Sequence, residues 1–185
     1  RILLIGGGLR GTLSEIAKHP VERIDYIELD EVLTKVARPY VSPATLQALA
    51  DPRVRLIHTD GRLFVKAADE KYDMIIVDVP DPATAVLNRY YTREFFREAE
   101  ALLNPDGVFV IGTTSTPDLR GIAIANRNAT IYQTLRSVFS HVLPAGERFM
   151  FYFATNAPGQ VSLDVPTLQE RYLSLIHISE PTRPY

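Results

Sequence analysis

The stretch Ile2-Leu3-Leu4-Ile5-Gly6-Gly7-Gly8-Leu9-Arg10-Gly11 decides the fold. Its four branched apolar residues predict a buried strand, and the amphipathic residues 11–19 after it predict a helix. Three glycines of the turn between them, Gly6, Gly8 and Gly11, are candidate cofactor-binding residues, because glycine lets backbone amides and a helix N-terminus approach a ligand closely. Several classes of nucleotide-binding enzyme share this turn, and a tight turn without a ligand is the alternative.

The same alternation of short apolar runs and helix-length stretches continues along the chain, which is typical of a parallel sheet with crossover helices. Further strands are predicted over 23–28, 54–58, 72–78 and 108–112, with 142–143 and 149–155 closing the sheet. Helices are predicted over 31–41, 61–68, 92–103 and 129–139, with a turn over 104–107. The pattern therefore predicts one doubly wound α/β domain.

The two ends of the chain differ from this pattern. Arg1 stands directly before a core strand, so we interpret residues 1–160 as an N-terminally truncated catalytic core and 161–172 as a tail. The string LSLIHISEPTRPY over 173–185 resembles a translated sequencing adapter and is interpreted as a non-native tail.

Composition limits the function classes. A net charge of −2 over 185 residues gives no basic excess for neutralising phosphates, so we expect no nucleic-acid partner. The chain has no cysteine, which fits a cytoplasmic location, and no apolar run approaches the roughly 20 residues of a membrane helix. Its four histidines lack metal-ligand spacing, so no metal is expected.

Acidic residues end two of the predicted strands. Glu28 follows the glycine turn by about 20 residues, where an acid can accept both ribose hydroxyls of a nucleoside. Asp30 could equally cap the next helix. Asp60-Gly61 ends the third strand, where the carboxylate could accept the amine of adenine or cap a helix.

Asp78-Val79-Pro80-Asp81-Pro82 follows the fourth strand. Asp78 and Asp81 are the candidate catalytic residues, since two carboxylates on a proline-stiffened loop suit a general base and a cationic substrate. We expect mutual repulsion to raise the pKa of at least one of them. The alternative is that both carboxylates merely stabilise turns.

The order of these motifs resembles the polyamine aminopropyltransferase (spermidine/spermine synthase) family. The segments that carry the resemblance are the glycine turn, YIELD over 26–30, ADPRV over 50–54, Asp60-Gly61 and YDMIIVDVPDP over 72–82. The resemblance implies a Rossmann-like, class I methyltransferase-type sheet that is mostly parallel with an antiparallel last strand. It also implies decarboxylated S-adenosylmethionine as co-substrate and a small cationic polyamine as partner.

The resemblance assigns a role to each candidate residue. The glycine turn holds the donor, Glu28 the ribose, and Asp60-Gly61 the adenine. Asp78 takes the proton of the amine and Asp81 helps to hold the polyamine.

Some features depart from the family. Leu9 stands where the family usually has an aspartate that contacts the aminopropyl amine. Residues 87–91 (LNRYY) resemble a branch that is fused to membrane-spanning segments, so a membrane-spanning region of the full-length protein and a homodimer stay open as partners. Alternatives are a methyltransferase using intact S-adenosylmethionine, an NAD-dependent oxidoreductase, and a non-catalytic nucleotide- or polyamine-sensing domain.

Overall fold

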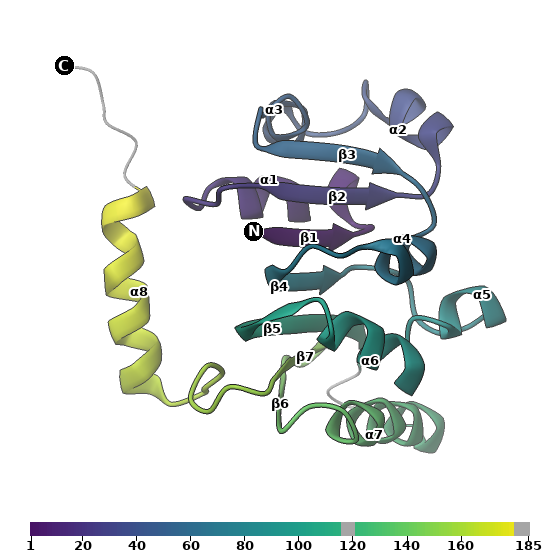
Figure 1. Cartoon of the computed structure of the whole chain (residues 1–185), viewed down its shortest axis with the longest axis vertical. Coiled ribbons are helices and arrows are strands. Elements are labelled where there is room, and N and C mark those ends of the chain that lie inside the picture. The colour runs from purple at the N-terminus through teal and green to yellow at the C-terminus, as the bar shows by residue number, and fades with distance from the viewer. Residues whose placement is uncertain (116–120, 180–185) are drawn as a thin grey trace.

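A single seven-stranded sheet organises the chain (Figure 1). The computed structural model describes the backbone of residues 1–115 and 121–179, and the side chains of 1–115 and 121–173. The strand order is β3-β2-β1-β4-β5-β7-β6. The strands are β1 (Ile2–Ile5), β2 (Ile24–Glu28), β3 (Val54–His58), β4 (Tyr72–Val77), β5 (Leu103–Thr114), β6 (His141–Ala145) and β7 (Phe149–Thr155).

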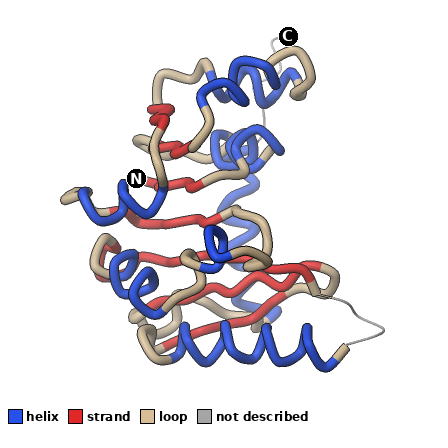
Figure 2. The backbone as a smooth tube through the Cα atoms, turned by 90° about the vertical axis from the view of Figure 1, so that its right-hand side faces the viewer, coloured by secondary structure: helices blue, strands red, loops and turns tan. Residues whose placement is uncertain are grey.

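The sheet is mostly parallel, as predicted. β1 lies between β2 and β4 in parallel register, with Ile5 opposite both Ile27 and Val77. β7 runs antiparallel between β5 and β6, which confirms the predicted antiparallel closing strand. In Figure 2 the strands follow one another as a single layer with helices packed around it. The carboxyl ends of β1 to β4 therefore share one edge, where ligands of doubly wound sheets bind.

Helices connect the strands. They are α1 (Thr12–Ala17), α2 (Glu31–Ala37), α3 (Pro43–Leu49), α4 (Gly61–Ala67), α5 (Ala85–Asn88), α6 (Arg93–Glu100), α7 (Ile122–Arg136) and α8 (Val165–Ser179), with a 3-10 turn η1 (Gly8–Arg10) before α1. In the described part of the chain, no helix has both the length and the apolar character needed to cross a membrane.

Two apolar cores cover the two faces of the sheet. Successive residues of a strand point to opposite faces, so Leu3 and Ile5 of β1 enter the larger core and Leu4 enters the smaller one. The larger core adds α4, α6 and α7, and the aromatic rings of Phe95, Phe96, Phe109 and Phe139 pack together there. The smaller core is closed by α1 and α3.

The structure corrects several predicted elements. Helix α3 was not predicted; Ser42 caps it by accepting from the amide of Thr45, and Pro43 occupies its first turn. The short helix α5 was also missed. The predicted turn over 104–107 is an irregularity inside β5, because β4 pairs first with Leu103 and then with Val108. Helix α7 begins at Ile122, ahead of the predicted residue 129.

The C-terminal helix α8 stands away from the sheet (Figure 1). It begins inside the predicted tail 161–172 and extends into the adapter-like string as far as Ser179. Leu173 is exposed, and the side chains of Leu175 and Ile178 lie outside the described residues. The interpretation of 173–185 as a non-native tail stays a prediction.

Candidate active site

A cavity of about 350 Å³ opens at the shared edge of β1, β2, β3 and β4. Its wall includes Gly6, Glu28, Gly61 and Asp78 among the predicted site residues. Asp60 and Asp81 lie beside this wall and not in it, and so do Gly8 and Gly11. The structure thus brings the ends of all four strand motifs to one cavity, as the parallel topology requires.

The glycine turn leaves space for Asp78. Gly6 and Gly7 have φ values of 72° and 68°, in the left-handed region that favours glycine. A Cβ on Gly7 would lie 1.9 Å from Oδ2 of Asp78, and one on Gly6 would lie 2.7 Å from the Asp78 carbonyl oxygen. Gly7 was not among the predicted site residues, although it lines the cavity.

Gly8 and Gly11 are not among the residues that line this cavity. A Cβ on Gly8 would lie 2.4 Å from Cζ of Tyr26, so this glycine makes room for a buried ring. Gly11 has a φ of 111° and starts α1. Both glycines shape the turn, and their predicted role in cofactor binding stays a prediction.

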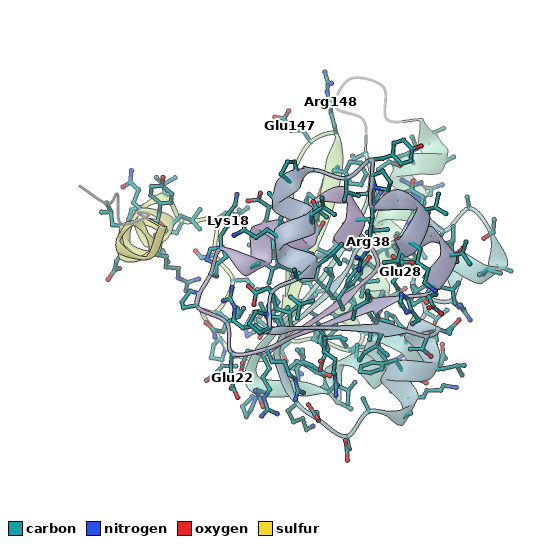
Figure 3. All side chains as sticks on the ribbon, turned by 90° about the horizontal axis from the view of Figure 1, so that it is seen from above. Lys18, Glu22, Glu28, Arg38, Glu147 and Arg148 are labelled. Carbon is teal, nitrogen blue, oxygen red and sulfur yellow. The ribbon has the colours of Figure 1, made fainter. Side chains whose placement is uncertain are left out.

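Glu28 is held in place at the end of β2 (labelled in Figure 3). The Tyr26 hydroxyl donates to Oε2 over 2.8 Å, and the Leu29 amide donates to Oε1 over 3.0 Å. Burial and the hydrogen bond to Glu28 raise the pKa of Tyr26, so its hydroxyl remains a donor. Neighbouring Asp30 caps α2, because its Oδ1 accepts from the amides of Val32 and Leu33.

Asp60 serves as a helix cap and an ion-pair partner. Its Oδ1 accepts from the amides of Arg62 (2.8 Å) and Leu63 (3.2 Å), and its Oδ2 pairs with Arg89. Burial raises the pKa of Asp60, but the hydrogen bonds from Arg89 and the two amides outweigh burial and leave the pKa below its usual value. Gly61 lines the cavity, and a Cβ added to Gly61 would lie 2.6 Å from Cγ2 of Ile5.

Asp78 is fixed from two sides. The Thr12 hydroxyl donates to Oδ2 over 2.7 Å, and Nη2 of Arg10 lies 2.5 Å from Oδ1. Asp78 also lines a second, smaller cavity of about 130 Å³, where the rings of Phe149 and Phe151 stack. Asp78 is therefore one of the residues that line both cavities.

Asp81 points toward the end of β5 and the start of α7. It accepts from the Thr113 hydroxyl (3.1 Å), from the amide (2.8 Å) and hydroxyl of Thr114, and from Nη1 of Arg127 (2.7 Å). Burial raises the pKa of Asp81, but these donors together lower it. The rise in pKa that was expected for at least one of the two carboxylates does not occur at Asp81, because this carboxylate has its own arginine partner.

The arginine partners are the part of the site that the sequence motifs did not indicate. Arg10, Arg89 and Arg127 lie 68, 29 and 46 positions from the aspartates that they pair with. No local spacing marks such pairs. Within the described residues, no group of three or more histidine and acidic side chains is arranged to hold a metal ion.

Comparison with known proteins places this site in context. Residues 1–153 match the model of the spermine/spermidine synthase domain. The polyamine aminopropyltransferase of Korarchaeum cryptofilum is 30% identical over 181 residues, covering 93% of this chain and 54% of that protein. The chain spans about half the length of the curated relatives it matches.

Solved structures agree on the fold. A spermidine synthase in complex with the transition-state analogue AdoDATO superposes with a TM-score of 0.78 at 24% identity, covering all of this chain and 62% of that one. Human methyltransferase-like protein 13 in complex with SAH superposes with a TM-score of 0.72 at 22% identity, covering all of this chain and 83% of that one. These structures have the same α/β sheet, mostly parallel with an antiparallel strand.

Proposed function

Because the chain belongs to the spermine/spermidine synthase family, we propose that it is the donor-binding core of an aminopropyltransferase. The reaction transfers the aminopropyl group of decarboxylated S-adenosylmethionine to an amine of a polyamine. The observation that carries this proposal is the position of Asp78, a fixed carboxylate at the end of a cavity that Glu28 lines from the other side.

The order of the strands orients the donor. The cavity runs from the end of β3 over β2 and β1 to β4. Adenine then lies near Thr59 and Gly61 after β3, and the ribose lies at Glu28 after β2. The sulfonium tail crosses the glycine turn toward Asp78, so the reacting carbon and the base come together.

Asp78 supplies the chemistry that an amine acceptor needs. An alkylammonium has no lone pair, so one proton must leave before nitrogen can attack. Asp78 accepts that proton, the nitrogen forms a bond to the carbon beside sulfur, and the carbon–sulfur pair stays on sulfur. The sulfonium becomes neutral and leaves as methylthioadenosine.

For Asp81 the contacts support a positioning role. Both of its oxygens accept hydrogen bonds from Thr113, Thr114 or Arg127, so a polyamine ammonium would have to share a carboxylate that is already paired. Asp81 joins the loop after β4 to β5 and α7, and this holds Asp78 at the cavity. We place this activity in the cytoplasm, which the absence of cysteine supports.

The proposal is tested by assaying the full-length protein with decarboxylated S-adenosylmethionine, intact S-adenosylmethionine and a panel of diamines. We expect release of methylthioadenosine together with an aminopropylated product. If the protein binds methylthioadenosine but turns over no donor, the transferase proposal fails and a sensing domain takes its place.

Replacing Glu28 by alanine is expected to weaken methylthioadenosine binding by about ten- to a hundredfold. The reason is that hydrogen bonds to a charged acceptor contribute roughly 1.5–3 kcal/mol. Calorimetry on the full-length protein measures the change, with Glu31→Ala as control, because Glu31 is exposed on α2 and pairs with Lys35. Unchanged affinity in Glu28→Ala would remove this residue from the ribose site.

A further inference from the structure

Arg89 is a charged residue in the cavity wall to which the proposed reaction gives no role. Its side chain is 35% exposed, whereas that of its ion-pair partner Asp60 is 16% exposed. Asp60 is not part of the wall, so Arg89 is the member of this pair that lines the cavity. Because Asp60 directly precedes Gly61, the ion pair holds Arg89 at the end of the cavity where the proposed donor places adenine.

Two contacts fix the guanidinium of Arg89. Nη2 donates to Oδ2 of Asp60, and the guanidinium carbon lies 5.3 Å from the centre of the Tyr90 ring. Burial lowers the pKa of Arg89, but the hydrogen bond to Asp60 outweighs burial and raises the pKa, so the group stays charged. A side chain that is already held in place loses little freedom when a ligand binds. The guanidinium is therefore a preorganised donor.

A fixed N–H donor at this position matches one edge of adenine. N1 of adenine accepts a hydrogen bond, and a guanidinium has more N–H donors than the single oxygen of Asp60 uses. The other charged side chains of the described wall are assigned elsewhere, because Arg10 and Asp78 lie at the tail end and Glu28 lies at the ribose. This leaves Arg89 as the charged group for the base.

We infer that Arg89 is a specificity-determining residue that reads the base of the donor, by donating a hydrogen bond to N1 of adenine. Asp60 then acts as a positioning residue, and the adenine contact that the motif assigns to it runs through Arg89. The inference rests on the donor orientation of the proposed function. It concerns the base alone, so it leaves the decarboxylated tail and Asp78 to the reaction.

Three ligands that differ at single atoms of the base test this inference by calorimetry on the full-length protein. They are methylthioadenosine and its 1-deaza and 7-deaza analogues, in which a C–H group replaces N1 or N7. We expect wild type to bind methylthioadenosine about ten- to a hundredfold more tightly than the 1-deaza analogue. Arg89→Met removes the donors, so it should weaken methylthioadenosine and the 7-deaza analogue by the same factor and leave the 1-deaza analogue unchanged.

Two further variants make the result specific. Arg93→Met makes the same change at an exposed residue of the first turn of α6, outside the wall, and should alter none of the three affinities. Thermal unfolding shows whether each variant is folded. If Arg89→Met does not fold because Asp60 loses its partner, Arg89→Lys decides in its place. Lysine keeps a positive charge beside Asp60 but lacks the planar fork, so the preference for methylthioadenosine over the 1-deaza analogue should fall.

The outcomes separate the two proposals. If Arg89→Met weakens all three ligands equally or none, or if wild type binds the 1-deaza analogue as tightly as methylthioadenosine, the reading of N1 is wrong while the nucleoside site stands. An undiminished preference in Arg89→Lys, where that variant decides, overturns the inference in the same way. If wild type does not bind methylthioadenosine at all, the proposed donor site fails, and this inference fails with it.

Discussion

Replacing Asp78 by asparagine is expected to slow transfer by about 10²- to 10⁴-fold while methylthioadenosine still binds, because a positioned general base contributes that order of rate. Asparagine keeps the size of the side chain but cannot take the proton of the amine. The contacts to Thr12 and Arg10 hold this carboxylate in one orientation. The other carboxylate among the described residues of the cavity wall, that of Glu28, lies at the end of β2. Single-turnover rates at saturating donor measure the effect.

Asp69→Asn is the matched control for this experiment. Asp69 is exposed and precedes β4, at the opposite end of the strand that Asp78 follows. The control should keep its rate. A full rate in Asp78→Asn would show that another group removes the proton.

Replacing Gly7 by alanine is expected to lower the rate by at least about 10²-fold, since displacements near 1 Å in a reacting group cost that much. The added Cβ would lie 1.9 Å from Oδ2 and 2.3 Å from Cγ of Asp78, so the carboxylate must leave its place between Thr12 and Arg10. Alanine at a φ of 68° also costs roughly 1–2 kcal/mol of folding free energy. Urea unfolding and the transfer rate measure the two effects.

Gly159→Ala separates backbone strain from displacement of Asp78. Gly159 has a φ of 77°, and a Cβ there would meet nothing within 4 Å. This control should lose a similar amount of stability and keep its rate. If Gly7→Ala keeps its rate as well, the close approach of the turn to Asp78 does not matter for transfer.

The sequence predicted those parts of the fold that depend on local pattern. Runs such as Ile2 to Ile5 and Met74 to Val77 became core strands because both of their faces are covered. Helix α3 was missed because Pro39 and Pro43 resemble loop residues, whereas Pro43 sits in the first turn of a helix that Ser42 caps. Residues 104–107 belong to β5 and do not form a separate turn, because the pairing of β5 with β4 shifts register between Leu103 and Val108.

The sequence predicted which edge of the sheet carries the candidate site, but it did not predict how the charged side chains pair there. Parallel topology places Glu28, Gly61 and Asp78 at one edge, and this follows from the motif order alone. The pairing of Asp81 with Arg127 depends on how α7 packs beside β5, and a contact between residues 46 positions apart leaves no local signal. The sequence motifs therefore indicated an anionic pocket, whereas the structure has ion pairs at this edge.

The three aspartate–arginine pairs give this edge of the sheet a different response to ionic strength from that of the cores. Asp60–Arg89, Asp78–Arg10 and Asp81–Arg127 are all partly exposed, with arginine side chains 35%, 61% and 27% accessible. Dissolved ions screen such pairs over a Debye length of about 10 Å at 0.1 M salt, whereas apolar burial is not weakened in this way. Added salt should thus loosen the rim of the cavity, and the loop that carries Asp78, well before it affects the sheet that supports them.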